Sequence, residues 1–379
     1  MILGIDASNI RGGGGLTHLV ELLRAARPET HGFTQVVVWS GKATLRHIDN
    51  RPWLLKSHQS MLDRSLLHRI FWQRYRLSRL ARHVHCDVLF VPGGSFSGDF
   101  RPIVTMSQNL LPFEWLELKR FGWSWITLKL LLLRAAQTRT FRRADGVVFL
   151  TSYARDVVMR VAKFTAGGNR IIPHGIDERF THPPRAQLPA QAIDRPFRIL
   201  YVSIIDVYKH QVEVVAAVAA LRATGIPVEL DLVGPAYPPA LSRLERRLSQ
   251  VDPEGAFVSY AGAVAYEDLP ERYAAADIFL FASSCENLPI ILLEGMRSGL
   301  PIACSNRGPM PEILGDAGAY FDPVSSTDIA SALRTLIESP EIRARLAAAA
   351  FARSLVYSWT CCADETFAYL GDVARGGQS

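Results

Sequence analysis

The chain has 379 residues, of which 49% are hydrophobic and 21% are charged, so it holds enough apolar side chains for two cores of ordinary size. This composition excludes a disordered chain, and five cysteines without a Cys-x-x-Cys pair exclude a disulfide scaffold and favour a reducing, cytosolic compartment. Residues 1–180 hold 26 Lys and Arg against 13 Asp and Glu, whereas residues 181–379 hold 16 against 23. The basic first half indicates an anionic partner (nucleic acid, anionic lipid or a phosphorylated substrate) or a solvated basic face without one.

Short apolar runs rich in Val and Ile alternate with longer helical patterns along the chain. The predicted strands of the first half are residues 2–6, 35–39, 87–91, 103–106 and 146–150, and those of the second half are 198–203, 228–233, 257–260, 278–282 and 301–304. The stretches between them are long enough for helical crossovers. The sequence therefore predicts α/β domains whose parallel sheets are covered by helices.

The segment 181–196 contains four prolines and no periodicity, which predicts a linker. We expect two α/β domains of similar size on either side of it, facing each other across a cleft. Residues 1–6 resemble a buried strand and not a secretory signal, and no run reaches the roughly 18 apolar residues of a membrane span. We therefore expect a chain that does not cross a bilayer, although it can lie against one.

Four glycines at positions 12–15 follow the first predicted strand and precede an amphipathic helix. Glycines let the backbone approach a ligand closely, and a helix start offers N–H groups to an anion. The spacing matches neither the dinucleotide fingerprint nor a Walker loop, so it indicates no dinucleotide or ATP site. A flexible turn accounts for the glycines equally well.

A second cluster of polar residues follows the predicted strand 278–282. A proline in the first turn predicts a helix that starts near Asn287 and ends at about residue 298. Glu286 then lies beside the N–H groups of Asn287 and Leu288, where it can bind a polyol while the amides hold phosphate; alternatively, it only caps the helix. Glu294, further along among Ile and Leu, needs either a buried partner or a ligand.

Lys209 follows the predicted strand 198–203 after a short loop. A lysine at a helix start opposes the helix dipole, and this cost is easier to understand if an anion binds there. An exposed lysine with a small penalty is the alternative.

Glu286 and Glu294, followed by Gly-Met-Arg-Ser-Gly-Leu-Pro, resemble the E-x7-E signature of retaining GT-B glycosyltransferases of the group 1 (GT4) type. The segments 172–177 (Ile-Pro-His-Gly-Ile-Asp), 232–234, 260–262, 311–313 and 357–359 agree with the same family. The resemblance covers most of residues 170–360; over residues 1–150 it rests on the glycine run and the strand order. It implies a GT-B fold of two facing Rossmann-like domains, with residues 1–180 on the acceptor side, residues 181–357 binding a nucleotide-sugar, and a helix in 358–379 crossing back to the first domain.

The resemblance implies a retaining hexosyltransferase that moves a sugar from a nucleotide-diphosphate sugar to a saccharide acceptor. It implies no metal and no other cofactor, and no Asp-x-Asp motif is present. Glu286 would contact the donor sugar, and Lys209 would neutralise the departing diphosphate. The other donor contacts it implies are Asn287 and Leu288 at the diphosphate, Glu294 at the ribose, Gly262 and Val264 near the base, and Gly14 and Gly15 from the first domain.

Two positions depart from the family pattern. The family usually carries an arginine where this chain has Ile204, so one cation for the diphosphate is missing and Lys209 carries more of the task. Many relatives carry a His-Asp pair at the end of a first-domain strand, where this chain has Gln108 and Asn109. Either amide can hydrogen-bond a sugar, but neither can take a proton at neutral pH.

The basic first half predicts contact with an anionic membrane surface. Residues 64–84 form a predicted helix with one apolar face (Leu66, Ile70, Leu77, Leu80, Val84) and one basic and aromatic face (Arg64, Phe71, Trp72, Tyr75, Arg79, Arg82). Phe121, Trp123 and Trp125, followed by residues 128–133, offer a second contact, although these aromatics can also pack against a loop. We expect a peripheral protein on the inner face of the cytoplasmic membrane that uses a lipid-linked acceptor in envelope polysaccharide or lipopolysaccharide biosynthesis.

Other functions remain open at the level of the sequence. A GT-B sugar-nucleotide epimerase or a soluble transferase with a small acceptor fits the same donor residues. A non-catalytic partner subunit is suggested by the missing arginine and His-Asp pair, but Glu286, Glu294 and Lys209 argue against it. Nucleic-acid binding has no zinc-finger or RNA-binding signature in its support, so we expect no nucleic-acid partner.

Overall fold

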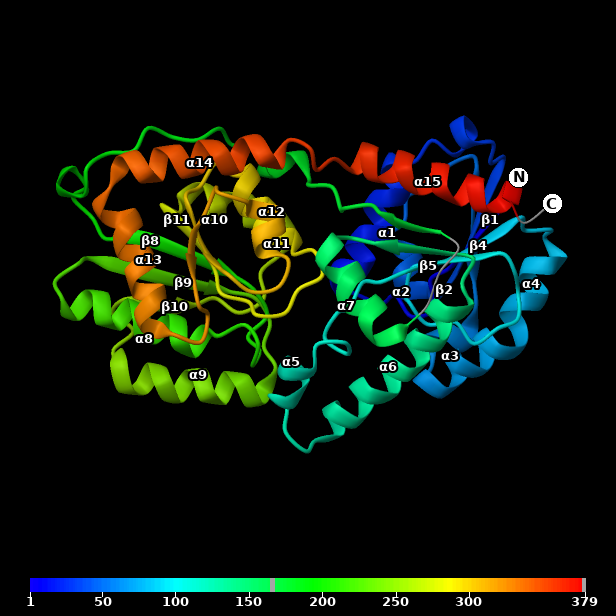
Figure 1. Cartoon of the computed structure of the whole chain (residues 1–379), viewed down its shortest axis with the longest axis horizontal. Helices are drawn as coiled ribbons and strands as arrows, with labels where there is room; N and C mark the ends of the chain where they lie inside the picture. The colour runs from blue at the N-terminus through cyan, green and yellow to red at the C-terminus, as the bar shows by residue number, and fades with distance from the viewer. Residues whose placement is uncertain (164–167, 377–379) are drawn as a thin grey trace. The chain divides into compact units, whose positions relative to one another are not determined.

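The computed structural model describes residues 1–163 and 168–376 (Figure 1). The chain forms two compact units. The first comprises residues 1–118, 122–175 and 357–379, and the second comprises residues 119–121 and 176–356. The chain passes from the first unit to the second after Gly175 and returns after Val356.

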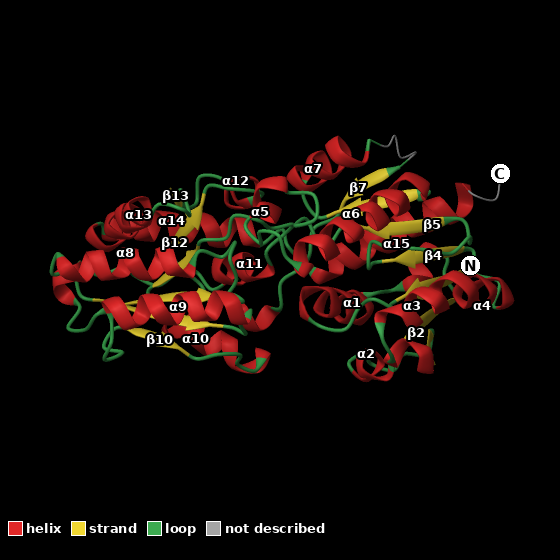
Figure 2. Ribbon diagram, turned by 90° about the horizontal axis from the view of Figure 1, so that it is seen from below, coloured by secondary structure: helices red, strands yellow, loops and turns green. Residues whose placement is uncertain are grey.

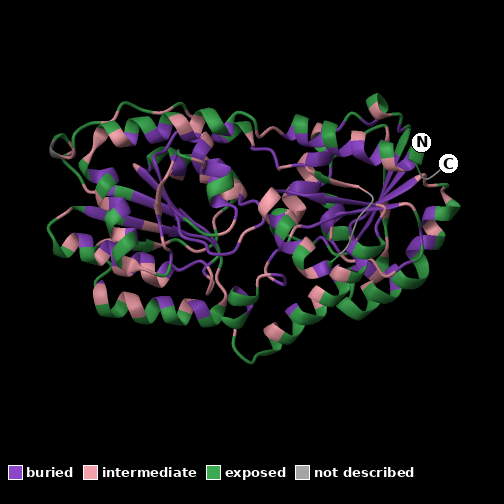
Figure 3. Cartoon of the chain, in the orientation of Figure 1, coloured by how far each residue is buried: buried purple, intermediate pink, exposed green. Residues whose placement is uncertain are grey.

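Within the described residues, the first unit holds a parallel sheet of seven strands in the order β3-β2-β1-β4-β5-β6-β7. The strands are β1 (Ile2–Asp6), β2 (Gln35–Ser40), β3 (Leu54–His58), β4 (Val88–Val91), β5 (Ile103–Met106), β6 (Gly146–Phe149) and β7 (Asn169–Ile171). Every residue of β4, β5 and β6 is buried, because helices cover both faces of the sheet (Figures 2 and 3). Strands buried on both faces consist of uninterrupted apolar residues, which is why the sequence predicts them well.

The helices of the first unit begin and end close to the loops at the sheet edges. They are α1 (Gly13–Ala25), α2 (Lys42–Arg46), α3 (Leu66–Trp72), α4 (Ser78–His83), α5 (Trp115–Lys119), α6 (Trp125–Arg143), α7 (Ser152–Ala162) and α15 (Trp359–Gly376). The last of them, α15, packs against α1 and β4. Its buried side chains, which include Phe367 and Leu370, complete the core on that face of the sheet.

The predicted helix over residues 64–84 is interrupted by a π-helical segment, η3 (Gln73–Leu77), between α3 and α4. The wider π turn shifts the phase of the helix, so the face predicted from a regular helix is wrong in the first half. Leu66 and Ile70, predicted to share one apolar face with Leu77, are exposed, whereas Leu77 is buried. Trp72, predicted on the opposite face, is 1% exposed, and its indole N–H donates to the side-chain oxygen of Gln59 at 3.2 Å.

The second unit, whose backbone is described throughout, holds a parallel sheet of six strands in the order β10-β9-β8-β11-β12-β13. The strands are β8 (Phe197–Val202), β9 (Val228–Val233), β10 (Val258–Tyr260), β11 (Ile278–Phe281), β12 (Ile302–Ser305) and β13 (Ala319–Phe321). The helices are α8 (Gln211–Ala223), α9 (Pro238–Val251), α10 (Leu269–Ala275), α11 (Ile290–Arg297), α12 (Met310–Leu314), α13 (Ser326–Glu338) and α14 (Pro340–Ser354). The chain reverses its direction of winding between β10 and β11, which makes β8 and β11 neighbours at the centre of the sheet.

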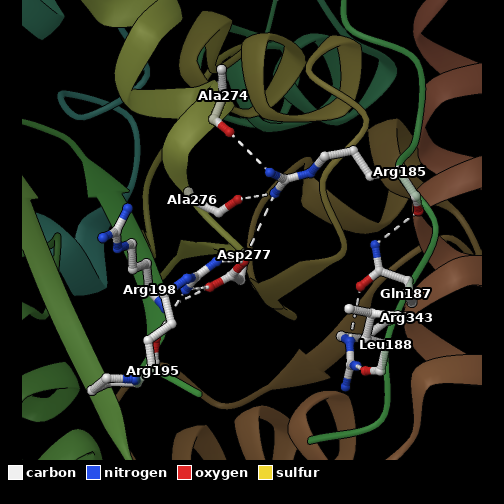
Figure 4. A network of polar contacts seen from close by, with 10 residues as sticks. Arg185, Gln187, Leu188, Arg195, Arg198, Ala274, Ala276, Asp277 and Arg343 are labelled. Atoms are coloured by element: carbon white, nitrogen blue, oxygen red, sulfur yellow. Dashed lines mark hydrogen bonds and ion pairs between the residues drawn. The ribbon is translucent and has the colours of Figure 1, made fainter. Parts of the chain in front are cut away.

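The proline-rich segment before β8 is fixed to the second unit by arginines (Figure 4). Arg185 donates to the backbone carbonyls of Ala274 and Ala276, and both guanidinium nitrogens of Arg195 bind the carboxylate of Asp277 at 2.6 and 2.9 Å. Arg343 of α14 is only 1% exposed. This segment, predicted as a linker, is therefore held against the unit that follows it.

A buried pair of histidines lies where the chain leaves the first unit. The Nδ1 atoms of His18 on α1 and of His174 are 2.8 Å apart, and both rings lie within 6 Å, centroid to centroid, of the ring of Trp359 at the start of α15. A Cβ atom on Gly175 would come 2.1 Å from the backbone nitrogen of Trp359, so only glycine fits there. One imidazole donates and the other accepts, so the two rings cannot both be protonated.

Burial lowers the pKa of His18 to about 4, and burial together with the nearby His18 lowers the pKa of His174 well below its usual range. Between pH 6.5 and 4 the unfolded chain therefore binds protons that the folded chain excludes, so the free energy of unfolding falls as the pH falls. The pKa shift of His18 alone corresponds to a loss of about 3 kcal/mol across this window.

We expect urea unfolding, measured from pH 7 to pH 4.5, to show a smaller loss in His18→Gln, because glutamine keeps a hydrogen bond without titrating. His47→Gln, at an exposed histidine, is the matched control and should retain the wild-type pH dependence. An unchanged slope in His18→Gln would contradict the assignment of the pH dependence to this pair.

Candidate functional site

Lys209 and Glu286 meet at the carboxyl edge of the second sheet. Lys209 lies in the loop between β8 and α8, and Glu286 lies in the loop between β11 and α11. Because β8 and β11 are neighbouring parallel strands, their following loops emerge side by side. The Lys209 ammonium forms an ion pair with the Glu286 carboxylate, and the two side chains are only 6% and 15% exposed.

Hydrogen bonds between the two loops hold the ion pair in place. The hydroxyl of Tyr201 on β8 donates to the carbonyl of Lys209 at 2.6 Å, and the backbone N–H of Ser284 donates to the carbonyl of Tyr208 at 2.9 Å. His210 caps α8 with a φ of 55°, a left-handed conformation that is rare outside glycine. Its Nε2 atom is 3.0 Å from the hydroxyl of Ser284, so side-chain contacts from the β11 loop stabilise this backbone.

The helix after Glu286 begins later than the sequence predicts. Asn287 and Leu288 lie in the turn before α11, which starts at Ile290 with Pro289 as its N-cap. The residue before a proline avoids the helical region, so Leu288 cannot belong to the first turn. Asn287 and Leu288 are each 6% exposed, and they lie between Glu286 and the N-terminus of the helix.

Glu294 is buried inside α11, and its carboxylate is bound by two phenols. The hydroxyl of Tyr266 lies 3.2 Å from one carboxylate oxygen and that of Tyr273 lies 3.0 Å from the other. Burial raises the pKa of Glu294 to about 8, against the opposing effect of the two hydroxyls. The sequence predicted that Glu294 needs a partner, and tyrosines from η6 (Tyr266–Asp268) and α10 are its partners in this structure.

Gly262 and Val264 lie on the loop that leads from β10 to η6. Gly262 has a φ of 69° and its carbonyl accepts a hydrogen bond from the N–H of Gly234 at 2.8 Å. Both residues are partly exposed. Because Tyr266 follows two residues later, this loop is connected directly to the carboxylate of Glu294.

In the first unit, the glycine run lies within α1 and not before it, because this helix starts at Gly13. A Cβ atom on Gly15 would lie 2.8 Å from the side-chain oxygen of Gln108, whereas one on Gly14 would meet no atom within 4 Å. Gly15 and Gln108 are therefore neighbours at the carboxyl edge of the first sheet. The side-chain oxygen of Asn109 accepts a hydrogen bond from the N–H of Leu111 at 3.1 Å, which closes a local turn. Of the two amide side chains, Gln108 is therefore the better candidate for a ligand contact.

Ile204, which stands where the family resemblance expects arginine, has a partly exposed side chain. Its carbonyl accepts a hydrogen bond from the side-chain amide of Gln211 at 2.9 Å. The position therefore contributes a backbone carbonyl to the packing of α8 and no charge. In this loop, Lys209 supplies the ammonium group that can bind an anion.

Residues 186–353 match the model of a protein family described as glycosyl transferases group 1. This matched segment lies within the second unit and carries the pattern of that family. Over 110 residues, or 29% of each chain, the protein is 34% identical to the O-antigen chain mannosyltransferase B of Escherichia coli. Over 245 residues it is 31% identical to a GDP-mannose-dependent alpha-(1-6)-phosphatidylinositol dimannoside mannosyltransferase of Mycobacterium tuberculosis, which covers 63% of this chain and 61% of that one.

Among solved structures, the sucrose-phosphate synthase of Thermosynechococcus elongatus matches 100% of this chain and 99% of its own, with a TM-score of 0.75 and 19% sequence identity. The fold class predicted from the sequence, two parallel-sheet α/β domains of the GT-B type, is thus confirmed, and the family resemblance is confirmed over residues 186–353. The matched segments span only 29% and 61% of the lengths of the two mannosyltransferases.

In residues 1–163 and 168–376, no three or more His, Cys, Asp and Glu side chains are grouped so that they could hold a metal ion. No helix in the same ranges combines the length and the apolar character that a bilayer span requires.

Some contacts of the site lie beyond what sequence reasoning found. The hydroxyls of Tyr266 and Tyr273 form hydrogen bonds with the Glu294 carboxylate, and the hydroxyl of Tyr201 holds the backbone carbonyl of Lys209. The segment 266–276 has no ligand motif, so only the three-dimensional contact identifies these tyrosines. Tyr201 lies in a predicted strand, where a hydroxyl in an otherwise apolar run is a weak signal of a buried polar partner.

Proposed function

We propose that the protein is a group 1 glycosyl transferase that moves a hexosyl residue from a nucleotide-diphosphate sugar to a saccharide acceptor, with retention of the anomeric configuration. The observation that supports this most directly is the ion pair of Lys209 and Glu286 at the carboxyl edge of β8 and β11. Removing two charges from water is costly, and apolar packing would serve the fold equally well. A nucleotide-diphosphate sugar offers a partner to each charge, phosphate to the lysine and hydroxyls to the glutamate.

In the proposed reaction, the bond between the sugar C1 and the leaving phosphate oxygen breaks while the acceptor oxygen bonds to C1 on the same face. The acceptor proton passes to the departing phosphate oxygen. Negative charge accumulates on the diphosphate as the C1–O bond lengthens, and the Lys209 ammonium would stabilise it. Glu286, released from the lysine, would accept hydrogen bonds from the sugar hydroxyls and hold C1 in position.

The remaining donor contacts follow the order of elements at this edge. The backbone of Asn287 and Leu288 would hold the diphosphate beside α11, and Gly262 and Val264 would contact the base. Glu294 would bind the ribose if a ribose hydroxyl replaces that of Tyr266 on its carboxylate. The mycobacterial relative is named as a GDP-mannose-dependent enzyme, which supports this class of donor. The proposal involves no metal.

We also propose that the acceptor is lipid-linked, that the protein works peripherally at the inner face of the cytoplasmic membrane, and that it serves envelope polysaccharide or lipopolysaccharide biosynthesis. The relatives support this, since one is named for O-antigen chains and another for a phosphatidylinositol glycoside. The first unit also supports it. Its exposed apolar side chains gather on α3 and around the start of α6, and they include Leu67, Phe71, Trp123 and Trp125.

The donor class is testable by thermal unfolding with UDP-, GDP-, ADP- and dTDP-sugars. A ligand present at 100 times its dissociation constant stabilises the folded state by about 2.7 kcal/mol. We expect sugars of one nucleotide to raise the melting temperature by roughly 5–10 °C, since 1 kcal/mol shifts a unit of this size by about 2–4 °C.

Transfer of the same sugar to a lipid-linked acceptor, followed by chromatography of the product, completes this test. Binding without transfer would favour the non-catalytic subunit, and turnover of the donor without any acceptor would favour an epimerase. No thermal shift with any of the four nucleotides would refute the proposed activity.

A further inference from the structure

Helix α6 exposes apolar side chains over its N-terminal half. Trp123, just before the helix, is fully exposed, and Trp125 and Leu132 are 75% and 62% exposed. Leu128 and Leu131 between them are also exposed. A helix on the surface of a globular domain normally turns such residues toward the core, so this half of α6 carries an apolar surface suited to a partner other than water.

The C-terminal half of the same helix carries arginines that line a groove beside α7. The groove has a volume of about 680 Å³, and its lining includes Arg134, Arg139, Arg142, Arg143, Leu131 and Val161 of α7. Among the described residues that line it, none is acidic. Four like charges on one side of a helix repel one another, so the groove has the electrostatic character of an anion site.

No carboxylate neutralises these arginines within the described part of the chain. Arg134, Arg139, Arg142 and Arg143 form no ion pair there, whereas Arg101 and Arg155 of the same unit each bind an aspartate. Arg142 is anchored by donating its Nε–H to the carbonyl of Ala162 at 2.5 Å, which fixes its guanidinium at the groove wall. Guanidinium groups present several N–H donors in a planar fork that matches the oxygens of a phosphate.

The apolar surface and the groove are continuous, because Leu131 belongs to both. Leu132 and Arg143 are eleven positions apart, which corresponds to about 16 Å along the helix axis. An amphipathic helix that lies in a membrane interface buries its apolar side chains about 5–10 Å into the headgroup and acyl boundary and keeps its basic residues among the phosphates. A helix that inserts Trp123, Trp125 and Leu132 in this way carries the groove at the level of the phosphates.

We propose that the groove between α6 and α7 binds the phosphate headgroup of an anionic membrane lipid while the N-terminal half of α6 inserts beside it. This rests on the proposed function in one respect only, the membrane-bound acceptor. It assigns a defined binding site to the general attraction between the basic unit and the membrane.

The test is sedimentation of the full chain with phosphatidylcholine vesicles that contain or lack phosphatidylglycerol. Arg139 and Arg143 are exposed, and their side chains form no hydrogen bond or ion pair within the described part of the chain, so Arg139→Glu with Arg143→Glu should fold normally. Each basic residue near an anionic surface contributes about a fivefold gain in binding. We expect the double variant to bind anionic vesicles at least about 25-fold more weakly, and Arg139→Gln with Arg143→Gln to show a smaller loss.

The matched control is Arg246→Glu with Arg345→Glu, which makes the same change in net charge at exposed arginines of the second unit. It should retain wild-type vesicle binding. Equal losses in the two charge-reversed proteins would show attraction by net charge alone and would overturn the site, as would undiminished binding by the variant with reversed charges at 139 and 143. Stabilisation of the wild type by inorganic phosphate without binding to anionic vesicles would assign the groove to a free phosphate.

The donor panel is independent of this experiment. A wild-type protein that binds anionic vesicles through the groove but responds to no nucleotide-sugar would refute the proposed activity and leave the lipid site intact. If a nucleotide-sugar stabilises the protein but the substitutions in the groove leave vesicle binding unchanged, the lipid site is refuted and the proposed activity stands.

Discussion

Replacement of Lys209 by methionine is expected to lower the rate of sugar transfer by about 10²–10³-fold, because one fixed donor at a developing negative charge typically contributes that much. The effect should fall mainly on kcat, since the charge on the diphosphate is greatest in the transition state. Because Ile204 stands where the family usually carries an arginine, no arginine of this loop helps Lys209 to stabilise the charge on the diphosphate. Initial rates at saturating donor, measured by release of the nucleotide diphosphate, provide the readout.

Controls separate this role from a structural one. Lys42→Met removes an exposed lysine of the first unit and should leave the rate unchanged, and Lys209→Arg keeps the charge and should recover part of the loss. Glu286→Gln removes the other half of the ion pair. Because the two side chains are in contact, the effects of Lys209→Met and Glu286→Gln should not be additive in the double variant. A folded Lys209→Met protein with near-normal kcat would remove the lysine from the mechanism.

The sequence predicts the central strands of both sheets because they are buried on both faces. The strands β4 and β11 contain only apolar residues, and their short length together with the turn residues that follow them favours a buried strand over a buried helix. The strands that sequence reasoning missed, β3, β7 and β13, lie at sheet edges. β3 carries Lys56, Ser57 and His58, so an edge strand that is partly exposed on both faces has no continuous apolar signal.

The proximity of Lys209 and Glu286 follows from topology, since parallel strands that are neighbours end at the same edge. The sequence alone does not show that the two form an ion pair, because that depends on side-chain conformations within two loops. The pattern of apolar residues also gives no sign of the π-helical segment Gln73–Leu77, which changes the face of the surrounding helix that is buried. Contacts such as that of His18 with His174 join residues 156 positions apart and leave no local signal.

Arg343 is a buried charged residue of the second unit. Its guanidinium donates to the carbonyls of Leu336 and Ile337 at the end of α13, at 2.5 and 2.7 Å, and to the carbonyl of Leu188 and the side-chain oxygen of Gln187 in the segment before β8 (Figure 4). One side chain thus satisfies helix-end carbonyls that would otherwise be buried without donors, and it ties the proline-rich segment to α14.

We expect Arg343→Ala to lower the free energy of unfolding of the second unit by about 3–5 kcal/mol, because each buried acceptor left without a donor costs about 1–3 kcal/mol. At about 2–4 °C per kcal/mol, its calorimetric transition should fall by roughly 10 °C. Arg345→Ala, two residues further along α14 at an exposed position, is the matched control and should change the transition little. Arg343→Met keeps most of the volume without the donors, so an equal loss in methionine and alanine variants would assign the effect to hydrogen bonding. A loss below about 1 kcal/mol in both would mean that water or a rearranged segment replaces the guanidinium.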